Sequence, residues 1–227
     1  MKRSFLLVGF LLVLVTLQAC SPGPKPEDYR STEPFEYYVY FPEAYKADVD
    51  WLLFVGVHAA DETGEDCFRR WQPLADENRY VLLCPTFQVG ADGLNENNSE
   101  GRIATVLRLL YSTYPFQRQF FIAGNGAGGE FALRYALRYR SAMSGVASLA
   151  AEVYPAPTSA AEDFPILVLV GSEHEEGVAG AQAFEQGMRS SNLPLRVLTL
   201  DGEDDDLSSD ASRLAVDFAL QASRIIP

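Results

Sequence analysis

Short apolar runs alternate with amphipathic stretches along most of this chain. The apolar runs predict strands over residues 35–41, 51–57, 80–83, 119–123, 146–150, 166–170 and 195–200. Runs that are apolar on both faces are typical of strands covered by helices on both sides. Helices are predicted between them, over residues 67–78, 99–112, 128–140, 179–191 and 210–225. This alternation predicts an α/β fold with a doubly wound, mainly parallel sheet of about seven strands, in one domain over residues 35–227.

The first 19 residues have the layout of a secretory signal peptide. Lys2 and Arg3 precede an apolar run over residues 5–17, and the small Ala19 stands directly before Cys20. The run is too short to anchor the chain by itself, because a transmembrane helix needs about 20 residues. We therefore expect residues 1–19 to be removed from the mature protein.

The end of this leader, Leu17-Gln18-Ala19-Cys20, resembles the lipobox of bacterial lipoproteins. The resemblance implies that Cys20 carries lipid and that the protein is extracytoplasmic, held to the bilayer of a bacterial membrane, the outer one where there are two. Residues 20–34 are then the lipidated cysteine and a tether, since the proline-rich stretch at residues 22–26 cannot form regular structure. The alternative is an ordinary signal peptide with a cysteine near its cleavage site.

The charge of the chain limits its partners. There are 18 lysines and arginines against 31 aspartates and glutamates, a formal charge of −13. Such a surface does not attract phosphate backbones, so no nucleic-acid partner is expected. We also identify no cofactor motif and expect no cofactor.

Two cysteines remain in the body of the domain, Cys67 and Cys84. Outside the cytoplasm a disulfide between them is permitted. Two separately buried thiols are the alternative, because sequence alone does not pair cysteines. Neither cysteine has a neighbouring histidine or a CxxC spacing, so no metal site is predicted on them.

Two acidic segments, residues 61–66 and 203–206, are expected at the carboxyl edge of the sheet, where sites of open α/β folds lie. One hypothesis is a divalent ion that bridges them. Solvated loops are the alternative, since neither segment has the spacing of a calcium-binding loop.

A glycine-rich turn joins the strand over residues 119–123 to the helix that follows. Its sequence is Gly124-Asn125-Gly126-Ala127-Gly128. Small residues two before and two after the centre are typical of the nucleophile elbow, G-x-S-x-G. Because of this turn and the strands and helices around it, the chain from about residue 35 to 226 resembles the α/β-hydrolases. Among them it is most similar to small esterases related to feruloyl esterases and polyhydroxybutyrate depolymerases.

The resemblance implies roles for further residues. Backbone amides of Ala59, Ala60 and Ala127 would form the oxyanion hole. The turn after residues 167–171 would carry the catalytic acid, and the turn after residues 198–200 the catalytic base. These roles fall on the wrong side chains: Gly126 stands at the nucleophile, His174 at the acid and Asp205 at the base. Glycine has no attacking atom, and an aspartate titrates near 4, too low to shuttle protons at neutral pH.

The remaining candidate residues surround the same turn. His58, Asn125 and Glu173 are expected to line a binding cleft, with His58 in a structural role. His174 is either a base oriented by Glu173 or Glu175, or a solvated loop histidine. Ser172 and Thr86 are the candidate replacement nucleophiles.

The sequence therefore predicts a degenerate esterase, a pseudoenzyme that acts by binding a small molecule or an envelope protein. One alternative is an active carboxylic-ester hydrolase with a non-standard nucleophile or base. The other is a purely structural scaffold of the cell envelope.

Overall fold

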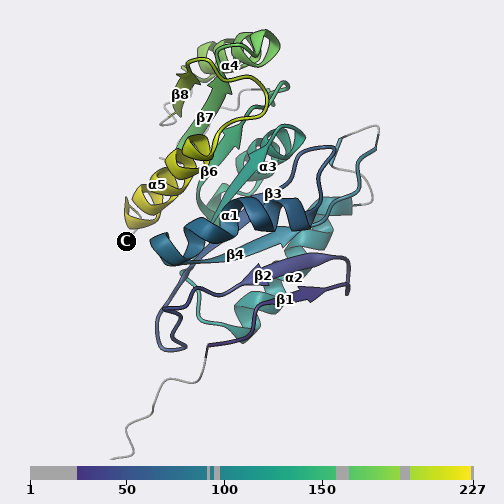
Figure 1. Ribbon diagram of the computed structural model, residues 1–227, viewed down its shortest axis with the longest axis vertical. Helices are drawn as coiled ribbons and strands as arrows, with labels where there is room; N and C mark the ends of the chain where they lie inside the picture. Colours follow the sequence, from purple (N-terminus) through teal and green to yellow (C-terminus); the bar gives the residue numbers. More distant parts are fainter. Residues whose placement is uncertain (1–24, 91–92, 95–97, 157–163, 190–194, 226–227) are drawn as a thin grey trace, which may run out of the picture.

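The computed structural model describes residues 25–90, 93–94, 98–156, 164–189 and 195–225. Within these residues one sheet of eight strands has the order β1-β2-β4-β3-β5-β6-β7-β8 (Figure 1). The strands are β1 (Tyr29–Ser31), β2 (Tyr37–Tyr40), β3 (Leu52–Val57), β4 (Tyr80–Pro85), β5 (Phe120–Asn125), β6 (Met143–Leu149), β7 (Ile166–Gly171) and β8 (Leu195–Leu200). The helices are α1 (Gly64–Asn78), α2 (Ser99–Thr113), α3 (Ala127–Arg138), α4 (Glu175–Met188) and α5 (Ser209–Ile225), with a short 3₁₀ turn, η2, at Arg140–Ala142.

The strands from β4 through β8 pair in parallel, and β1 and β2 add an antiparallel edge. Every residue of β3, β4, β5, β6 and β7 is buried. This explains why their sequences are apolar on both faces. The edge strand β8 has no buried residue.

Helices cover both faces of the sheet. On one face α1 and α5 pack together, and Figure 1 shows them in front of the strands. On the other face α2, α3 and α4 contribute the buried side chains. No helix in the described part of the chain is both long and apolar enough to cross a membrane.

The predicted α/β architecture is confirmed, and one boundary needs correction. The expected tether over residues 20–34 contains β1, where Tyr29 pairs with Val39 of β2. The Tyr29 ring also packs edge-on against Tyr37, with ring centroids 6.1 Å apart. The sheet therefore begins before residue 35, and it has one strand more than expected. Cys20 and the rest of residues 1–24 lie outside the described residues.

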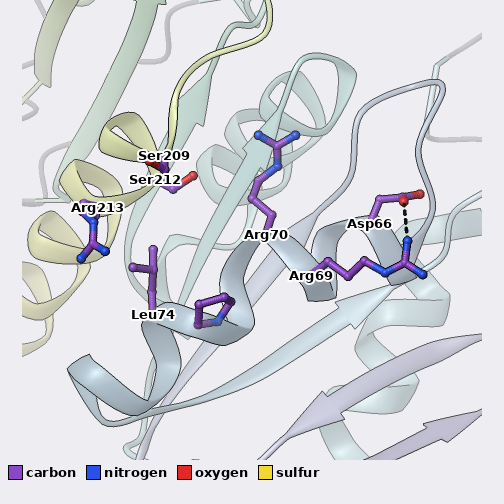
Figure 2. Close-up of a pocket in the computed structure, with 8 residues that line it drawn as sticks. Asp66, Arg69, Arg70, Leu74, Ser209, Ser212 and Arg213 are labelled. Carbon is purple, nitrogen blue, oxygen red and sulfur yellow. Dashed lines mark ion pairs between the residues drawn. The ribbon is translucent and has the colours of Figure 1, made fainter.

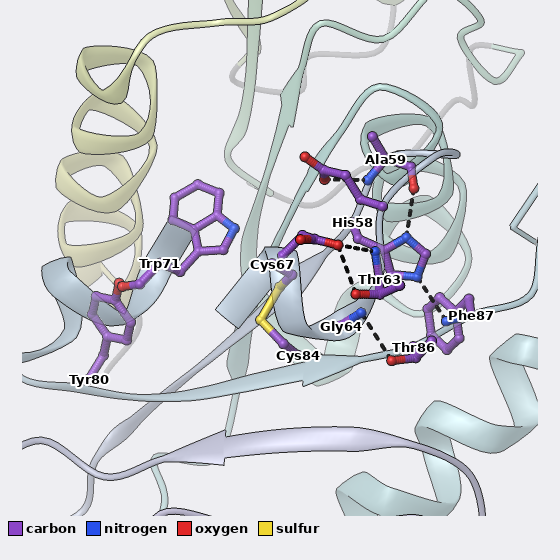
Figure 3. Close-up of a disulfide and its surroundings, with 12 residues drawn as sticks. His58, Ala59, Thr63, Gly64, Cys67, Trp71, Tyr80, Cys84, Thr86 and Phe87 are labelled. Atoms are coloured by element: carbon purple, nitrogen blue, oxygen red, sulfur yellow. Dashed lines mark hydrogen bonds between the residues drawn. A yellow bond between two sulfur atoms is a disulfide. The ribbon is translucent and has the colours of Figure 1, made fainter. Parts of the chain in front are cut away.

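A disulfide joins Cys67 of α1 to Cys84 of β4 (Figure 3). It lies against β3 at Gly56, where an added Cβ would come within 2.5 Å of the Cys67 sulfur. Of the two alternatives for these cysteines, the structure has the bond rather than two free thiols. The bond fixes α1 to β4, beside β3, whose carboxyl end reaches the site.

The loop from β3 into α1 is held by its own side chains. The Thr63 N–H and hydroxyl both donate to the Asp66 carboxylate, at 2.9 and 2.8 Å. This pairing of the residue before a helix with its first turn is a capping box. It sets the position of residues 59–62, which reach the carboxyl edge of the sheet.

Candidate functional site

The sharp turn between β5 and α3 has the geometry of a nucleophile elbow. Gly126 stands at its apex with φ 53° and ψ −122°, a backbone conformation that residues other than glycine rarely adopt. Its N–H donates to the Leu149 carbonyl oxygen of the adjacent strand, at 2.8 Å. The turn therefore keeps its shape although its apex has no side chain.

The glycines on either side of the apex are required by close packing. A Cβ on Gly124 would lie 2.0 Å from the Gly128 carbonyl oxygen, and a Cβ on Gly128 would lie 2.4 Å from the His58 carbonyl oxygen. At Gly126 the nearest atom to an added Cβ is the Ala59 Cβ, at 3.5 Å, an ordinary contact. There is space for a side chain at the apex but none at the flanking glycines.

A cavity of about 480 Å³ opens beside this apex at the carboxyl edge of the sheet. Its lining consists of small residues, one amide and five carboxylates: Ala59, Ala60, Asp61, Glu62, Asn125, Gly126, Ala127, Ala150, Glu152, Asp205 and Asp206. Six residues predicted for the site are among them. They are Gly126, Asp205, Ala59, Ala60, Ala127 and Asn125.

Two residues predicted to line the cleft do not. His58 is buried beneath it, only 1% exposed. Glu173 has an exposed side chain and lies at the end of β7, where its N–H donates to the Glu203 carbonyl oxygen at 2.8 Å. The backbone of Glu173 ties two loops together, and its carboxylate is outside the cavity.

His58 joins the ends of two neighbouring strands. Its Nε2 accepts a hydrogen bond from the Phe87 N–H at 2.9 Å, and its Nδ1 lies 2.6 Å from the Ala59 carbonyl oxygen (Figure 3). Because Nε2 must carry a lone pair to accept, the ring is neutral and Nδ1–H is the donor. Burial lowers the pKa of His58, which is consistent with a neutral structural histidine.

A carboxylate occupies one of the expected oxyanion donors. The Ala59 N–H donates to Glu62 Oε2 at 2.9 Å, and Arg70 of α1 donates to Glu62 Oε1 at 2.7 Å. An oxyanion that developed at Ala59 would therefore meet a negative charge already bound there. The Ala127 amide, at the start of α3, has no acceptor among the described residues.

His174 is not the solvated loop residue considered above. Its side chain is only 11% exposed and packs onto the first turn of α4, where an added Cβ on Gly177 would lie 2.5 Å from Nδ1. Its Nε2 lies 3.7 Å from Glu152 Oε1, and Glu152 lines the cavity. The carboxylate that faces His174 is therefore Glu152, rather than Glu173 or Glu175.

No hydroxyl or thiol lines the cavity as the structure describes it. Ser172 Oγ accepts from the Gly202 N–H at 2.9 Å. Thr86 Oγ1 donates to Glu36 Oε2 and accepts from the Gly64 N–H, both at 3.0 Å. Both candidate replacement nucleophiles thus serve as structural links between loops and strands.

The two acidic segments do meet at the cavity, through Asp61 and Glu62 on one side and Asp205 and Asp206 on the other. Even so, no three ligand-type side chains of the described residues come together as a metal site would require. The hypothesis of a bridging divalent ion gains no support from this geometry.

A second hollow, of about 410 Å³, lies on the flank of the molecule between α1 and α5. Three arginines line it (Figure 2), and each is paired with a carboxylate: Arg69 with Glu65 and Asp66, Arg70 with Glu62, and Arg213 with Glu77. In Figure 2 the Arg70 side chain extends from α1 away from Leu74. Arg70, which lines this hollow, pairs with Glu62, which lines the cavity beside Gly126. The candidate site itself is the cavity at the strand ends, not the hollow between α1 and α5.

Two residues of the site, Arg70 and Glu152, were not predicted from the sequence. Glu62 was expected in the acidic segment at residues 61–66, but its bonds to the Ala59 N–H and to Arg70 were not predicted. Glu152 had a usable signal, because it follows a predicted parallel strand and so must lie at the same edge as the elbow. Arg70 had none, since its partner is set by the path of the loop before α1.

No family model and no curated protein sequence matches this chain. Solved structures do resemble it. Poly(aspartic acid) hydrolase-1 from Sphingomonas sp. KT-1 has a TM-score of 0.68 at 14% identity, over 87% of this chain and 99% of that one. An S-formylglutathione hydrolase from Agrobacterium tumefaciens has a TM-score of 0.65 at 18% identity, over 85% and 90%.

A thermostable esterase has a TM-score of 0.64 at 14% identity over 86% of this chain, which spans 62% of that enzyme's length. Identities this low establish the fold alone. Together with the sheet order and the elbow, they show that this chain has the α/β-hydrolase fold, similar to that of esterases.

Gly126→Ser is expected to fold but to be less stable than the wild type. The added Cβ has room, but serine must adopt the strained backbone of the apex, at a cost of about 1–3 kcal/mol. Thermal unfolding should show a lower melting temperature. Gly128→Ser is the contrasting variant, and it should fail to give soluble protein because its Cβ meets backbone atoms. An unchanged or higher melting temperature for Gly126→Ser would contradict the elbow geometry.

His58 should make stability depend on pH below neutrality. The folded state keeps the ring neutral, whereas the unfolded chain protonates it near pH 6.5. The stabilisation is therefore complete above about pH 6.5 and is lost as the pH falls toward the lowered pKa, with a slope of at most about 1.4 kcal/mol per pH unit.

Urea unfolding at several pH values between about 7.5 and 5 measures this slope. In His58→Gln the slope should disappear, and in the control His174→Gln it should remain. The opposite pattern would assign the effect to His174.

Proposed function

We propose that this protein is a lipid-anchored, extracytoplasmic binding protein that has lost serine-hydrolase catalysis. The observation that carries the proposal is the bare apex at Gly126, beside a cavity with no hydroxyl or thiol in its described lining. A serine hydrolase needs an attacking oxygen at that point, activated by a base. In the part of the lining that the structure describes, neither such an oxygen nor an imidazole is present.

The expected loss of rate is large. Removing the triad of a serine protease lowers turnover by about a millionfold, and the remaining acceleration comes from the oxyanion hole and from binding. In this chain Glu62 already occupies the Ala59 amide, so part of that residual catalysis is also removed. Both effects act in the same direction, against ester hydrolysis.

The cavity itself supports binding rather than a purely structural role. The elbow, the strand ends and the loops from β3, β6 and β8 still surround a cavity of about 480 Å³. A scaffold that acted through its outer surface would have no requirement for such a cavity, which side chains larger than alanine at positions 59, 60, 127 and 150 would fill. The small residues at these four positions leave space for a ligand and so favour binding.

The alternative of an active ester hydrolase requires a substitute nucleophile. The similar solved structures named above are an esterase and two hydrolases, and this is the observation that favours the alternative. The two hydroxyls considered for the role are engaged elsewhere, Ser172 with Gly202 and Thr86 with Glu36 and Gly64. The arrangement therefore favours binding without turnover.

The purified mature protein should not react with a fluorophosphonate probe, because only an activated serine or an equivalent hydroxyl is phosphonylated. It should also leave p-nitrophenyl acetate unhydrolysed above the buffer rate. An active serine esterase treated in parallel is the positive control. Stoichiometric labelling of the folded protein that is lost on heat denaturation would refute the proposed loss of catalysis.

Lipid anchoring rests on Cys20 and its lipobox-like surroundings. Cys20→Ala should therefore move the protein from the membrane fraction to the soluble fraction when it is expressed in a bacterial host, and should abolish incorporation of radiolabelled palmitate. Ser21→Ala is the matched control and should remain in the membrane fraction. Membrane association of the Cys20→Ala protein equal to that of the wild type would contradict the anchor.

A further inference from the structure

We infer that the cavity beside Gly126 binds a small organic ammonium compound, such as a diamine. This inference rests on the proposed binding function and names the chemical class of the ligand. It depends on two independent features of the cavity: an excess of negative charge without matching cations, and a buried amide oxygen without a hydrogen-bond partner among the described residues.

The charge in the cavity is one-sided. Five carboxylates line it, and neither a lysine nor an arginine is among the lining residues. Arg70 compensates Glu62 from outside, and His174 faces Glu152. For Asp61, Asp205 and Asp206 the described part of the chain offers no ion pair.

These three aspartates come from two loops that the fold brings to one place. Asp61 follows β3, and Asp205 and Asp206 follow β8. Like charges gathered around one concave surface raise the local concentration of counter-ions more than isolated surface charges do. An entering cation would therefore be attracted by several carboxylates together.

Asn125 supplies the second feature. It is the last residue of β5, it lines the cavity, and the residue is only 6% exposed. Its amide oxygen accepts a hydrogen bond from none of the described residues. A buried polar group without a partner is uncommon in native proteins and indicates a missing donor. Because the unpartnered atom is an oxygen that accepts, the donor that fits is an N–H or O–H of a ligand.

The two features together select the ligand class. A metal ion is disfavoured, since no three ligand-type side chains of the described residues are close enough to coordinate one. An uncharged ester with a large apolar acyl group is disfavoured as well, because the lining consists of alanines, one glycine, one amide and carboxylates. An alkylammonium compound satisfies both features, with positive charge for the carboxylates and N–H donors for the amide oxygen.

Calorimetric titration of the mature protein tests this inference, with 1,5-diaminopentane as the probe. Its neutral and anionic counterparts, 1,5-pentanediol and glutarate, have the same chain length, and calcium chloride serves as the inorganic cation. The diamine should bind at one site, and its affinity should fall as sodium chloride is raised, because salt screens charge. The diol and glutarate should show no binding.

Variants locate the site. The double variant Asp205→Asn/Asp206→Asn should lower the affinity for the diamine by about tenfold or more, since two of the attracting charges are lost. The matched control is Asp48→Asn/Asp50→Asn, which removes the same net charge from an exposed segment before β3. It should bind the diamine as the wild type does. Asn125→Leu should also weaken binding, and melting temperatures of all variants show whether they are folded.

Several outcomes would overturn the inference. They are no diamine binding by the folded wild type, equal loss in the two double variants, equal binding of the diol, or a stronger response to calcium than to the diamine. None of them affects the proposed loss of catalysis, which the fluorophosphonate probe tests separately. Labelling by that probe together with specific diamine binding would refute the loss of catalysis and leave the ligand class standing.

Discussion

The close approach of the first turn of α3 to the ends of β5 and β3 is the constraint on which the rest of the site depends. Gly124 and Gly128 allow backbone atoms to meet where any Cβ would overlap a carbonyl group. This contact forces the chain through the tight turn at Gly126, and it places Asn125, Ala127 and Ala59 around one cavity. The His58 ring holds the second side of the same junction, through its bonds to Phe87 and Ala59.

Charge gives the cavity a character opposite to that of an ester hydrolase. Hydrolysis develops negative charge on a carbonyl oxygen, and an active site stabilises it with free backbone amides. In this protein a carboxylate held by Arg70 occupies the Ala59 amide, and further carboxylates lie around the opening. The bare apex and the acidic lining therefore both fit the binding function that we propose for this cavity.

The sequence predicted those parts of the structure that depend on local pattern. Strands buried on both faces were recognisable because their residues are apolar without interruption, and the elbow was recognisable from its glycines. β1 was not, since Tyr29–Ser31 is a three-residue edge strand with polar residues, next to a proline-rich segment. The burial of His174 was equally hidden, because it depends on the space left by Gly177 on the next helix.

Pairings between separate elements were beyond sequence patterns for a related reason. Glu62 and Arg70 are eight residues apart, on a loop and on a helix, and only the path of the capped loop brings them together. Glu152 meets His174 from a different loop altogether. The sequence placed Gly126, His174 and Asp205 at the ends of strands, whereas the identities of their partners required the three-dimensional structure.

The two flanking glycines have a consequence for how such proteins are classified. They are demanded by backbone contact between a strand and a helix, and that demand is the same whether the apex is a serine or a glycine. A search pattern built on small residues at this junction therefore detects the fold and does not report catalytic activity. The apex residue, midway between Gly124 and Gly128, has to be read separately, because the side chain at that position carries the nucleophile of a serine hydrolase.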